Sequence, residues 1–203
     1  MGLFGLFGKK QAAKKEEVKT NTASATAPEN DAEKWYVASY AMWSTYTDGD
    51  WHFVAGSKVK NQSEGASMRT MLRRDWLVSN KEALLDMADY LVKSYEQEDC
   101  APDELRQAAW DLCRANQILG MGYVGDYINR AEMDEASARV SRIMQKYFHS
   151  WNELYDSYLI GYRKWRSDAG EGAEQDIEAR ENLCRKLLEM PDGPCSLDWN
   201  TQF

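Results

Sequence analysis

The sequence predicts an all-α fold: a single compact helical domain of about six or seven helices that follows a disordered basic N-terminal tail. Large apolar side chains recur at steps of three and four residues along several segments, which is the period of a helix with one buried face. Residues that favour helix N-termini, among them Asn80 and Ser150, stand ahead of two of these segments. With 203 residues, 43% of them hydrophobic, the chain is long enough to bury a sizeable core.

The first 31 residues differ in composition from the rest. Residues 1–20 hold five Lys against two Glu, whereas the remainder holds 20 basic against 31 acidic side chains. The stretch TNTASATAPEND, residues 20–31, has no large apolar residue and is typical of a flexible linker. We therefore expect a basic tail and linker over residues 1–31 and a helical domain over residues 32–203.

The start of the chain, MGLFGLFGKK, combines apolar residues with lysines. It is too short to span a bilayer or to form a secretory signal, so a cytoplasmic location is expected. Leu6 stands where a myristoylation signal has Ser or Thr, which argues against lipidation. A weak anchor at the membrane surface and a start that is merely disordered, or docks on the domain, both remain open. The anchor would contact the membrane through Leu3, Phe4, Leu6, Phe7, Lys9 and Lys10.

The first part of the domain is rich in aromatic residues. Ring spacing predicts a helix over Lys34–Tyr46, ended by the turn residues 47–50. Residues 51–65 look like a loop with a short extended piece at His52–Val54. A helix over Ser67–Trp76 should follow.

The middle of the chain predicts two longer helices. Ser79 and Asn80 offer an N-cap for the helix over residues 81–97. Pro102 suits the first turn of the next helix, whose apolar face continues to Asn116. Three glycines then follow within six residues and either break this helix or let another helix approach closely. They are Gly120, Gly122 and Gly125.

Three further helices complete the expected domain. Residues 131–148 carry an amphipathic stripe, and Ser150 caps the next helix with Glu153 at the capping-box position. Gly161 in that helix indicates a tight helix crossing. After a glycine-bearing loop over residues 167–173, apolar residues from Ile177 to Leu188 predict the last helix.

Several kinds of chemistry are disfavoured by the residue pattern. The four Cys form no C-x-x-C pair, and Cys113 and Cys184 fall at apolar helical positions, so reduced thiols in the core are expected. The glycines after Leu119 follow a helix rather than a strand, which argues against dinucleotide binding. Only His52 and His149 are present, and no metal-ligand spacing appears. We therefore expect no metal and no cofactor.

The excess of acidic over basic side chains bears on which partners the chain could bind. A body with excess negative charge is unsuited to wrapping nucleic acid, because neutralised phosphates supply most of the non-specific affinity there. The charge is compatible with a basic protein partner, and ordinary solubility explains it equally well.

Landmark residues resemble a known family. The run AWDLCRANQILGMGYVGDYI and the later SWNELYDSYLIGYRKW, within residues 109–165, carry a W-D-x-x-R helix, a G-Y-x-x-x-Y-I turn and an S-W-x-E-x-x-x-x-Y-L-x-G helix. Together they resemble the bacterial family catalogued as domain of unknown function 1266. RRDWLVSNKEALLDMADYL resembles its N-terminal signature, and MPDGPCSLDW resembles its closing pattern, with Pro194 two residues early. The family's name implies no activity.

One set of residues stands out as a candidate site. Asp111 and Arg114 lie three residues apart on the W-D-x-x-R helix and can meet on one surface. The pair suits either an anion-binding site or a structural tie to neighbouring groups. Nearby rings suit either the core or an open binding groove. They are Tyr123, Tyr127, Tyr158, Tyr162 and Trp165.

Three functional hypotheses follow. The first is a protein-binding module of accessory or immunity type, which suits an acidic, aromatic-rich chain without catalytic motifs. The second is an enzyme of unfamiliar type that uses Asp111, Arg114 and Tyr hydroxyl groups. The third is a peripheral membrane protein anchored by Leu3–Lys15. The residue pattern favours the first hypothesis, and it favours a protein that is not an enzyme.

Overall fold

A computed structural model describes residues 24–97, 100–168 and 170–203. The described residues form nine α-helices, with one two-stranded antiparallel sheet of Ser24–Ala25 (β1) and Val59–Lys60 (β2). The helices are α1 (Asp31–Ser39), α2 (Ala41–Tyr46), α3 (Gln62–Trp76), α4 (Lys81–Glu96), α5 (Pro102–Leu105), α6 (Ala108–Val124), α7 (Arg130–Tyr147), α8 (Trp151–Ser167) and α9 (Ala173–Glu189). Two 3₁₀ turns, Val54–Gly56 and Pro194–Ser196, complete the elements. The all-α class is confirmed.

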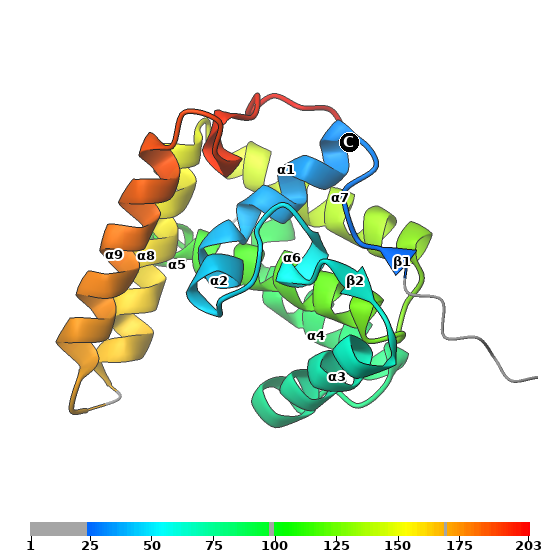
Figure 1. Ribbon diagram of the computed structural model, residues 1–203. Helices are drawn as coiled ribbons and strands as arrows, with labels where there is room; N and C mark the ends of the chain where they lie inside the picture. The colour runs from blue at the N-terminus through cyan, green and yellow to red at the C-terminus, as the bar shows by residue number, and fades with distance from the viewer. Residues whose placement is uncertain (1–23, 98–99, 169) are drawn as a thin grey trace, which may run out of the picture.

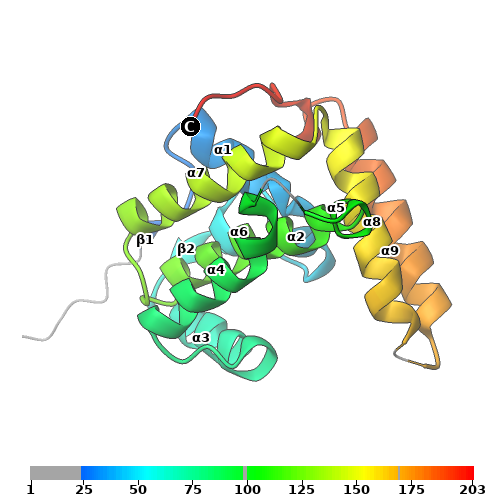
Figure 2. The same cartoon turned by 180° about the vertical axis from the view of Figure 1, so that it is seen from behind.

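Helix α6 is the centre of the fold (Figure 1). It packs against α4, α7, α8, α3 and α1, and fourteen of its seventeen residues are buried. In Figure 2, α4 and α7 lie next to α6, and α8 and α9 lie side by side at one edge of the molecule. Such a helix is apolar over most of its surface, and its half-buried residues are Trp110, Asp111 and Arg114.

Glycine permits the closest approach within this core. A Cβ atom on Gly122 would lie 2.1 Å from Leu84 Cδ2 of α4, and one on Gly120 would lie 2.8 Å from the Tyr40 hydroxyl oxygen. Both glycines lie within α6, and Gly125 is its C-cap. Of the two roles expected for this glycine run, close approach therefore applies to the first two residues and helix termination to the third.

Helix N-termini follow the capping rules. Asn80 Oδ1 accepts a hydrogen bond from the Ala83 amide, and Ser150 Oγ accepts one from the Glu153 amide, as expected. Asn129 and Glu132 form a reciprocal capping box at α7. Asn61 caps α3, so that helix begins five residues before the expected Ser67.

The helix count exceeds the expected six or seven for two local reasons. The expected helix Lys34–Tyr46 divides at Tyr40, whose buried hydroxyl accepts a hydrogen bond from the Ala55 amide at 3.2 Å. The helix expected to run on from Pro102 breaks after Leu105, because α5 buries none of its residues and nothing aligns it with α6.

Two extended segments lie where the sequence did not place them. The extended piece expected at His52–Val54 is wrong: Val54–Gly56 is a 3₁₀ turn, and Val59–Lys60 forms the strand. Residues 24–30 of the expected linker pack on the domain, since the Val54 amide donates to the Thr26 carbonyl at 3.1 Å and the Thr26 side chain is buried. The rest of the expected tail, residues 1–23, lies outside the described residues.

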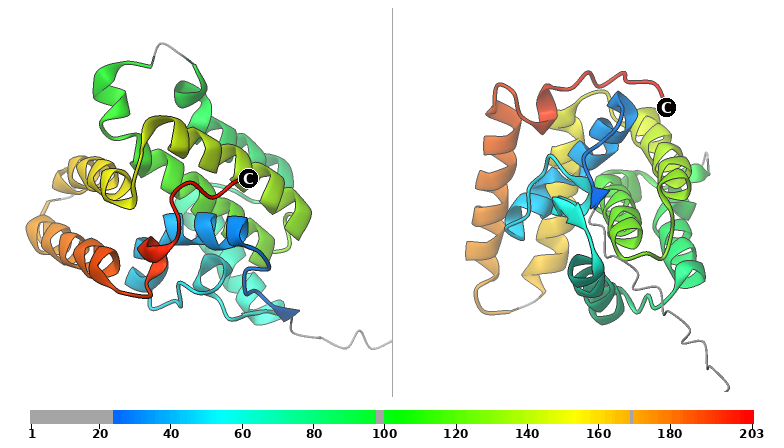
Figure 3. Two further views of the ribbon diagram at one scale, coloured as in Figure 1. Left: turned by 90° about the horizontal axis from the view of Figure 1, so that it is seen from above. Right: turned by 45° about the vertical axis from the view of Figure 1, so that its right-hand side comes forward.

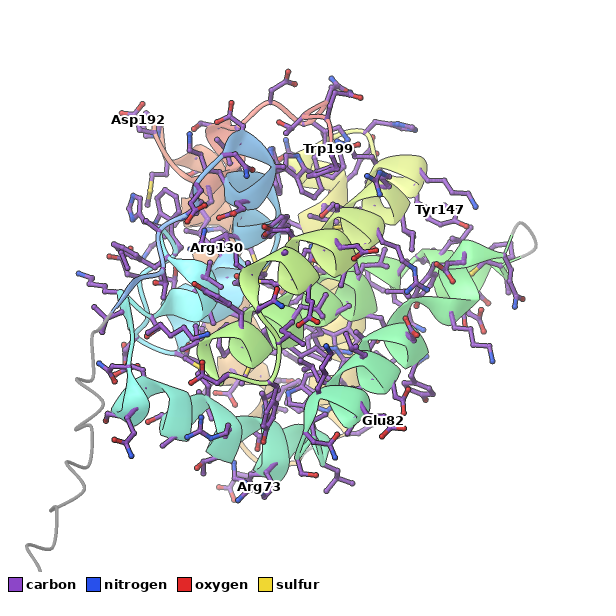
Figure 4. The ribbon with its side chains drawn as sticks, turned by 90° about the vertical axis from the view of Figure 1, so that its right-hand side faces the viewer. Arg73, Glu82, Arg130, Tyr147, Asp192 and Trp199 are labelled. Carbon is purple, nitrogen blue, oxygen red and sulfur yellow. The ribbon has the colours of Figure 1, made fainter. Side chains whose placement is uncertain are left out.

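The C-terminal segment, residues 197–203, crosses over α1 towards α7 (Figure 3). Trp199 meets the rings of Trp35 at 5.0 Å and Trp151 at 5.1 Å between centroids. Its indole N–H donates to the Phe148 carbonyl at 3.1 Å, and its own carbonyl accepts from the Trp35 indole at 3.1 Å. In Figure 4, which looks onto α7, Trp199 lies above the C-terminal half of that helix. Trp199 thus joins the first and last parts of the described chain.

Candidate functional site

Trp110 is the centre of an aromatic cluster between α6 and α8. Its ring centroid lies 5.4 Å from Tyr158, 5.7 Å from Tyr162 and 5.6 Å from Trp165. A Cβ atom on Gly161 would lie 2.3 Å from Trp110 Cβ, so only glycine lets the two helices come this close. The tight crossing expected at Gly161 is therefore a contact of α8 with Trp110.

Asp111 and Arg114 meet as the W-D-x-x-R spacing predicts. The Arg114 guanidinium donates to Asp111 Oδ1, and its Nε donates to the Trp110 carbonyl at 3.0 Å. The Tyr95 hydroxyl donates to the other Asp111 oxygen at 2.7 Å, and hydrogen bonding to Asp111 adds to burial in raising the pKa of Tyr95. Both Asp111 oxygens therefore have partners within the protein.

Arg114 also links two tryptophans. Its guanidinium carbon lies 4.3 Å from the Trp110 ring centroid and 5.3 Å from that of Trp76, at the end of α3. Trp110 in turn contacts Trp165, whose side chain is 56% exposed. Leu77, next to Trp76, is 86% exposed and caps α3 with φ of +56°. We name this surface, formed by Trp76, Leu77, Trp110, Arg114 and Trp165, the Trp165 face.

Tyr158 and Tyr162 lie beneath this face rather than in an open groove. Each is only 3% exposed, and burial raises the pKa of both hydroxyl groups. Arg180 of α9 donates to the Tyr158 hydroxyl at 2.7 Å and lies 4.7 Å from the Tyr162 ring centroid. These two tyrosines therefore support the Trp165 face from within.

Tyr123 and Tyr127 belong to a different region. Tyr123 lies beyond Arg114 along α6, where the twelve residues from Asp111 to Tyr123 correspond to about 18 Å of helix, and Tyr127 follows the end of α6 at Val124. Lys60 Nζ lies 4.2 Å from the Tyr123 ring centroid, and Arg130 packs on the same ring. The expected residue set is thus divided between two ends of α6.

The chain can be compared with known proteins on this basis. The family model described as "Protein of unknown function (DUF1266)" matches residues 8–202. The chain belongs to this family. No curated protein and no solved structure matches it. The resemblance expected from the W-D-x-x-R and S-W-x-E runs is confirmed. In this DUF1266 chain those runs lie in α6 and α8, which supply Trp110, Arg114 and Trp165 of the Trp165 face.

Sequence reasoning missed three contributors to this site, Trp110, Trp76 and its neighbour Leu77. Trp110 is the first residue of the DUF1266 W-D-x-x-R run, and the small residue facing it, Gly161, was the available signal of its central position. Trp76 lies 38 residues before Arg114 in the sequence. Its contact with Arg114 depends on how α3 crosses α6, which no local pattern specifies.

The other expected features can be placed as follows. Cys113 and Cys184 are each 1% exposed in the core, and burial raises the pKa of Cys184 to about 12. Within residues 24–97, 100–168 and 170–203, no group of His, Cys, Asp and Glu side chains could hold a metal ion. In the same residues, no helix has the length and apolar character needed to cross a membrane. The expected membrane contacts at residues 3–10 lie outside the described part of the chain.

Proposed function

We propose that this chain is a protein-binding module and that the Trp165 face is its contact surface. The observation that carries the proposal is the exposure of Trp165: more than half of an indole side chain is in water, although the same ring packs on Trp110. Tryptophan and arginine are the residue types that most often dominate binding energy in protein interfaces.

The support beneath this face favours binding. Trp165 contacts Tyr162 as well as Trp110, and Arg114 is held by Asp111 and the Trp110 carbonyl. Side chains that are already ordered lose little conformational freedom when a partner covers them.

Site-specific photo-cross-linking tests the proposal. A benzophenone amino acid at position 165 should form a covalent adduct of defined mass in the native cells, and unlabelled protein should compete with it. The matched control is position 160, because Ile160 is 36% exposed on the same helix and lies about 140° around it from Trp165. Absence of an adduct at position 165, or equal yields at both positions, would reject the Trp165 face as the contact surface.

Affinity measurements with the cross-linked partner supply the second test. Trp165→Ala should weaken binding by at least about tenfold, as expected for the loss of a central interface tryptophan. Ile160→Ala should leave the affinity unchanged. Circular dichroism should show the same helix content for both variants, since the side chain of Trp165 is largely outside the core.

A further inference from the structure

A cavity of about 310 Å³ lies on another side of the molecule, between α1, the loop after α2 and the turn before the C-terminal segment. Its volume is at the lower end of the range for small-molecule sites. The lining is mainly apolar and includes Val37, Trp51 and Leu197, with His52 and Lys34 among its polar members. No residue of the Trp165 face lines it. We name it the His52 pocket.

The walls of the His52 pocket are fastened independently of any ligand. The Trp151 indole N–H donates to the Leu197 carbonyl at 2.9 Å, which fixes the C-terminal wall. The loop wall is tied to the N-terminal wall through the hydrogen bond from the Val54 amide to the Thr26 carbonyl. Val37 is 1% exposed and belongs to the core of α1. The pocket is therefore preformed, as ligand sites usually are.

The His52 imidazole is held in one orientation. Its ring stacks on Trp51 with centroids 3.6 Å apart and an interplanar angle of 25°. Asp50 Oδ1 lies 2.7 Å from His52 Nδ1 and also accepts a hydrogen bond from the His52 amide at 3.1 Å. Lys58 lies 3.3 Å from the other Asp50 oxygen. Partial burial tends to raise the pKa of Asp50, but hydrogen bonds from His52 and Lys58 outweigh it, so the pKa is lowered.

The ionised Asp50 decides which imidazole nitrogen can serve a ligand. A carboxylate accepts hydrogen bonds and cannot donate them, so His52 Nδ1 carries the proton in this contact. Nε2 is the nitrogen left for other contacts. It accepts a hydrogen bond when the ring is neutral and donates one when the ring is protonated, so a hydroxyl or a carboxylate group can pair with it.

We infer that the His52 pocket binds a small planar aromatic molecule that carries a hydroxyl or carboxylate group. The aromatic ring occupies the apolar space beside Trp51, Val37 and Leu197. The oxygen substituent pairs with His52. Lys34 and Asp192 also line the pocket, and Lys34 is already paired with Asp31 at 2.8 Å, so His52 is the polar anchor. Aromatic stacking and a single polar anchor are the usual means by which such pockets select and orient a ring.

Histidine NMR provides a direct test, because His52 and His149 are the only histidines in the chain. Imidazole ¹H–¹⁵N spectra of the full chain are recorded with increasing 4-hydroxybenzoate, and His52→Ala and His149→Ala assign the signals. The His52 signals should shift saturably with Kd of about 10 mM or tighter, whereas those of His149 should not shift. Equal shifts at both histidines, or none at His52, would overturn the inference.

A series of ligands and a pair of variants test the oxygen group and the aromatic ring of the proposed ligand separately. Benzoate and phenol should each bind and reveal which oxygen group is preferred, and cyclohexanecarboxylate should bind at least about fivefold more weakly than benzoate because it cannot stack. Trp51→Ala should weaken 4-hydroxybenzoate binding at least about tenfold. Tyr90→Ala is the matched control, since Tyr90 is an exposed ring on α4 that does not line the pocket. Unchanged affinity in Trp51→Ala, or equal binding of the non-aromatic acid, would contradict an aromatic site.

Discussion

Glu33 and Glu132 show how two glutamates respond differently to neighbouring surroundings. Glu33 is buried beside Arg130, and burial raises its pKa although the Glu29 amide and Arg130 partly offset the effect. Glu132, two residues after Arg130, is paired with Lys81. Hydrogen bonds from Lys81 and the Asn129 amide lower its pKa. The two carboxyl groups should therefore contribute to stability with opposite dependence on pH.

Glu33→Gln and Glu132→Gln test this difference. A group with a raised folded pKa contributes most below its unfolded value of 4.5, and the contribution is lost as pH rises through the folded pKa. Glu33→Gln should therefore gain stability relative to the natural chain as pH rises above 4.5. Glu132 contributes above 4.5 and loses its contribution as pH falls through the lowered pKa. Glu132→Gln should therefore lose relative stability as pH rises from about 3 to 5.

Urea unfolding across this pH range provides the measurement. Because each variant is compared with the natural chain at every pH, the titration of all other groups cancels to first order. If the free energy of unfolding relative to the natural chain changed with pH in the same way for both variants, the surroundings of Glu33 would not disfavour its charged form.

At the scale of elements, the contact of α6 with α8 depends on Gly161. Alanine has the higher helix propensity, so Gly161→Ala would stabilise an isolated helix by about 0.5–1 kcal/mol. In this chain the new Cβ would lie 2.3 Å from Trp110 Cβ, an atom close to the backbone that cannot move aside. We expect the free energy of unfolding to fall by about 2–3 kcal/mol, as in overpacked cores.

Chemical denaturation and Trp fluorescence measure this effect. The fluorescence should change with the separation of Trp110 and Trp165, since both rings lie at this contact. Lys164→Ala, an exposed substitution on the same helix, serves as the control and should change stability by less than about 0.5 kcal/mol. If the Gly161→Ala variant were more stable than the natural chain, α6 and α8 would be able to move apart without a loss in the free energy of unfolding.

The elements also show what the sequence could and could not predict. Helix α7 was predicted from its apolar stripe, and the start of α8 from its stripe and the Ser150 cap, both nearly to the residue, because these signals lie within a few positions. The break at Tyr40 was missed, because the helical ring spacing on which that prediction rests continues through it. The Asp111–Arg114 pair was predicted because the two residues lie three positions apart on one helix. The contact of Arg114 with Trp76 was not predicted, because it joins two different helices.

At the scale of the whole molecule, Trp199 holds together elements far apart in the sequence. It packs on Trp35 of α1 and Trp151 of α8, and Gln145 of α7 donates to its carbonyl at 2.6 Å. Trp199→Ala should lower the free energy of unfolding by about 3–5 kcal/mol, the usual cost of removing a buried tryptophan.

Trp199→Phe separates packing from hydrogen bonding. It keeps a ring between Trp35 and Trp151 but removes the indole donor to the Phe148 carbonyl, so the loss should be intermediate between the natural chain and Trp199→Ala. Thermal and urea unfolding both measure this loss in the free energy of unfolding. If Trp199→Ala unfolds with the same midpoint as the natural chain, the C-terminal segment does not contribute to global stability.

The same tryptophan contact affects how the chain folds during synthesis. The Trp35 indole and the Trp199 carbonyl are 164 residues apart, and a ribosome adds about 5–20 residues per second. Helix α1 therefore waits roughly 10–30 seconds for this partner, with the apolar surface of Trp35 still uncovered on that side. Covering this side of Trp35 is therefore among the last steps by which the described chain completes its core.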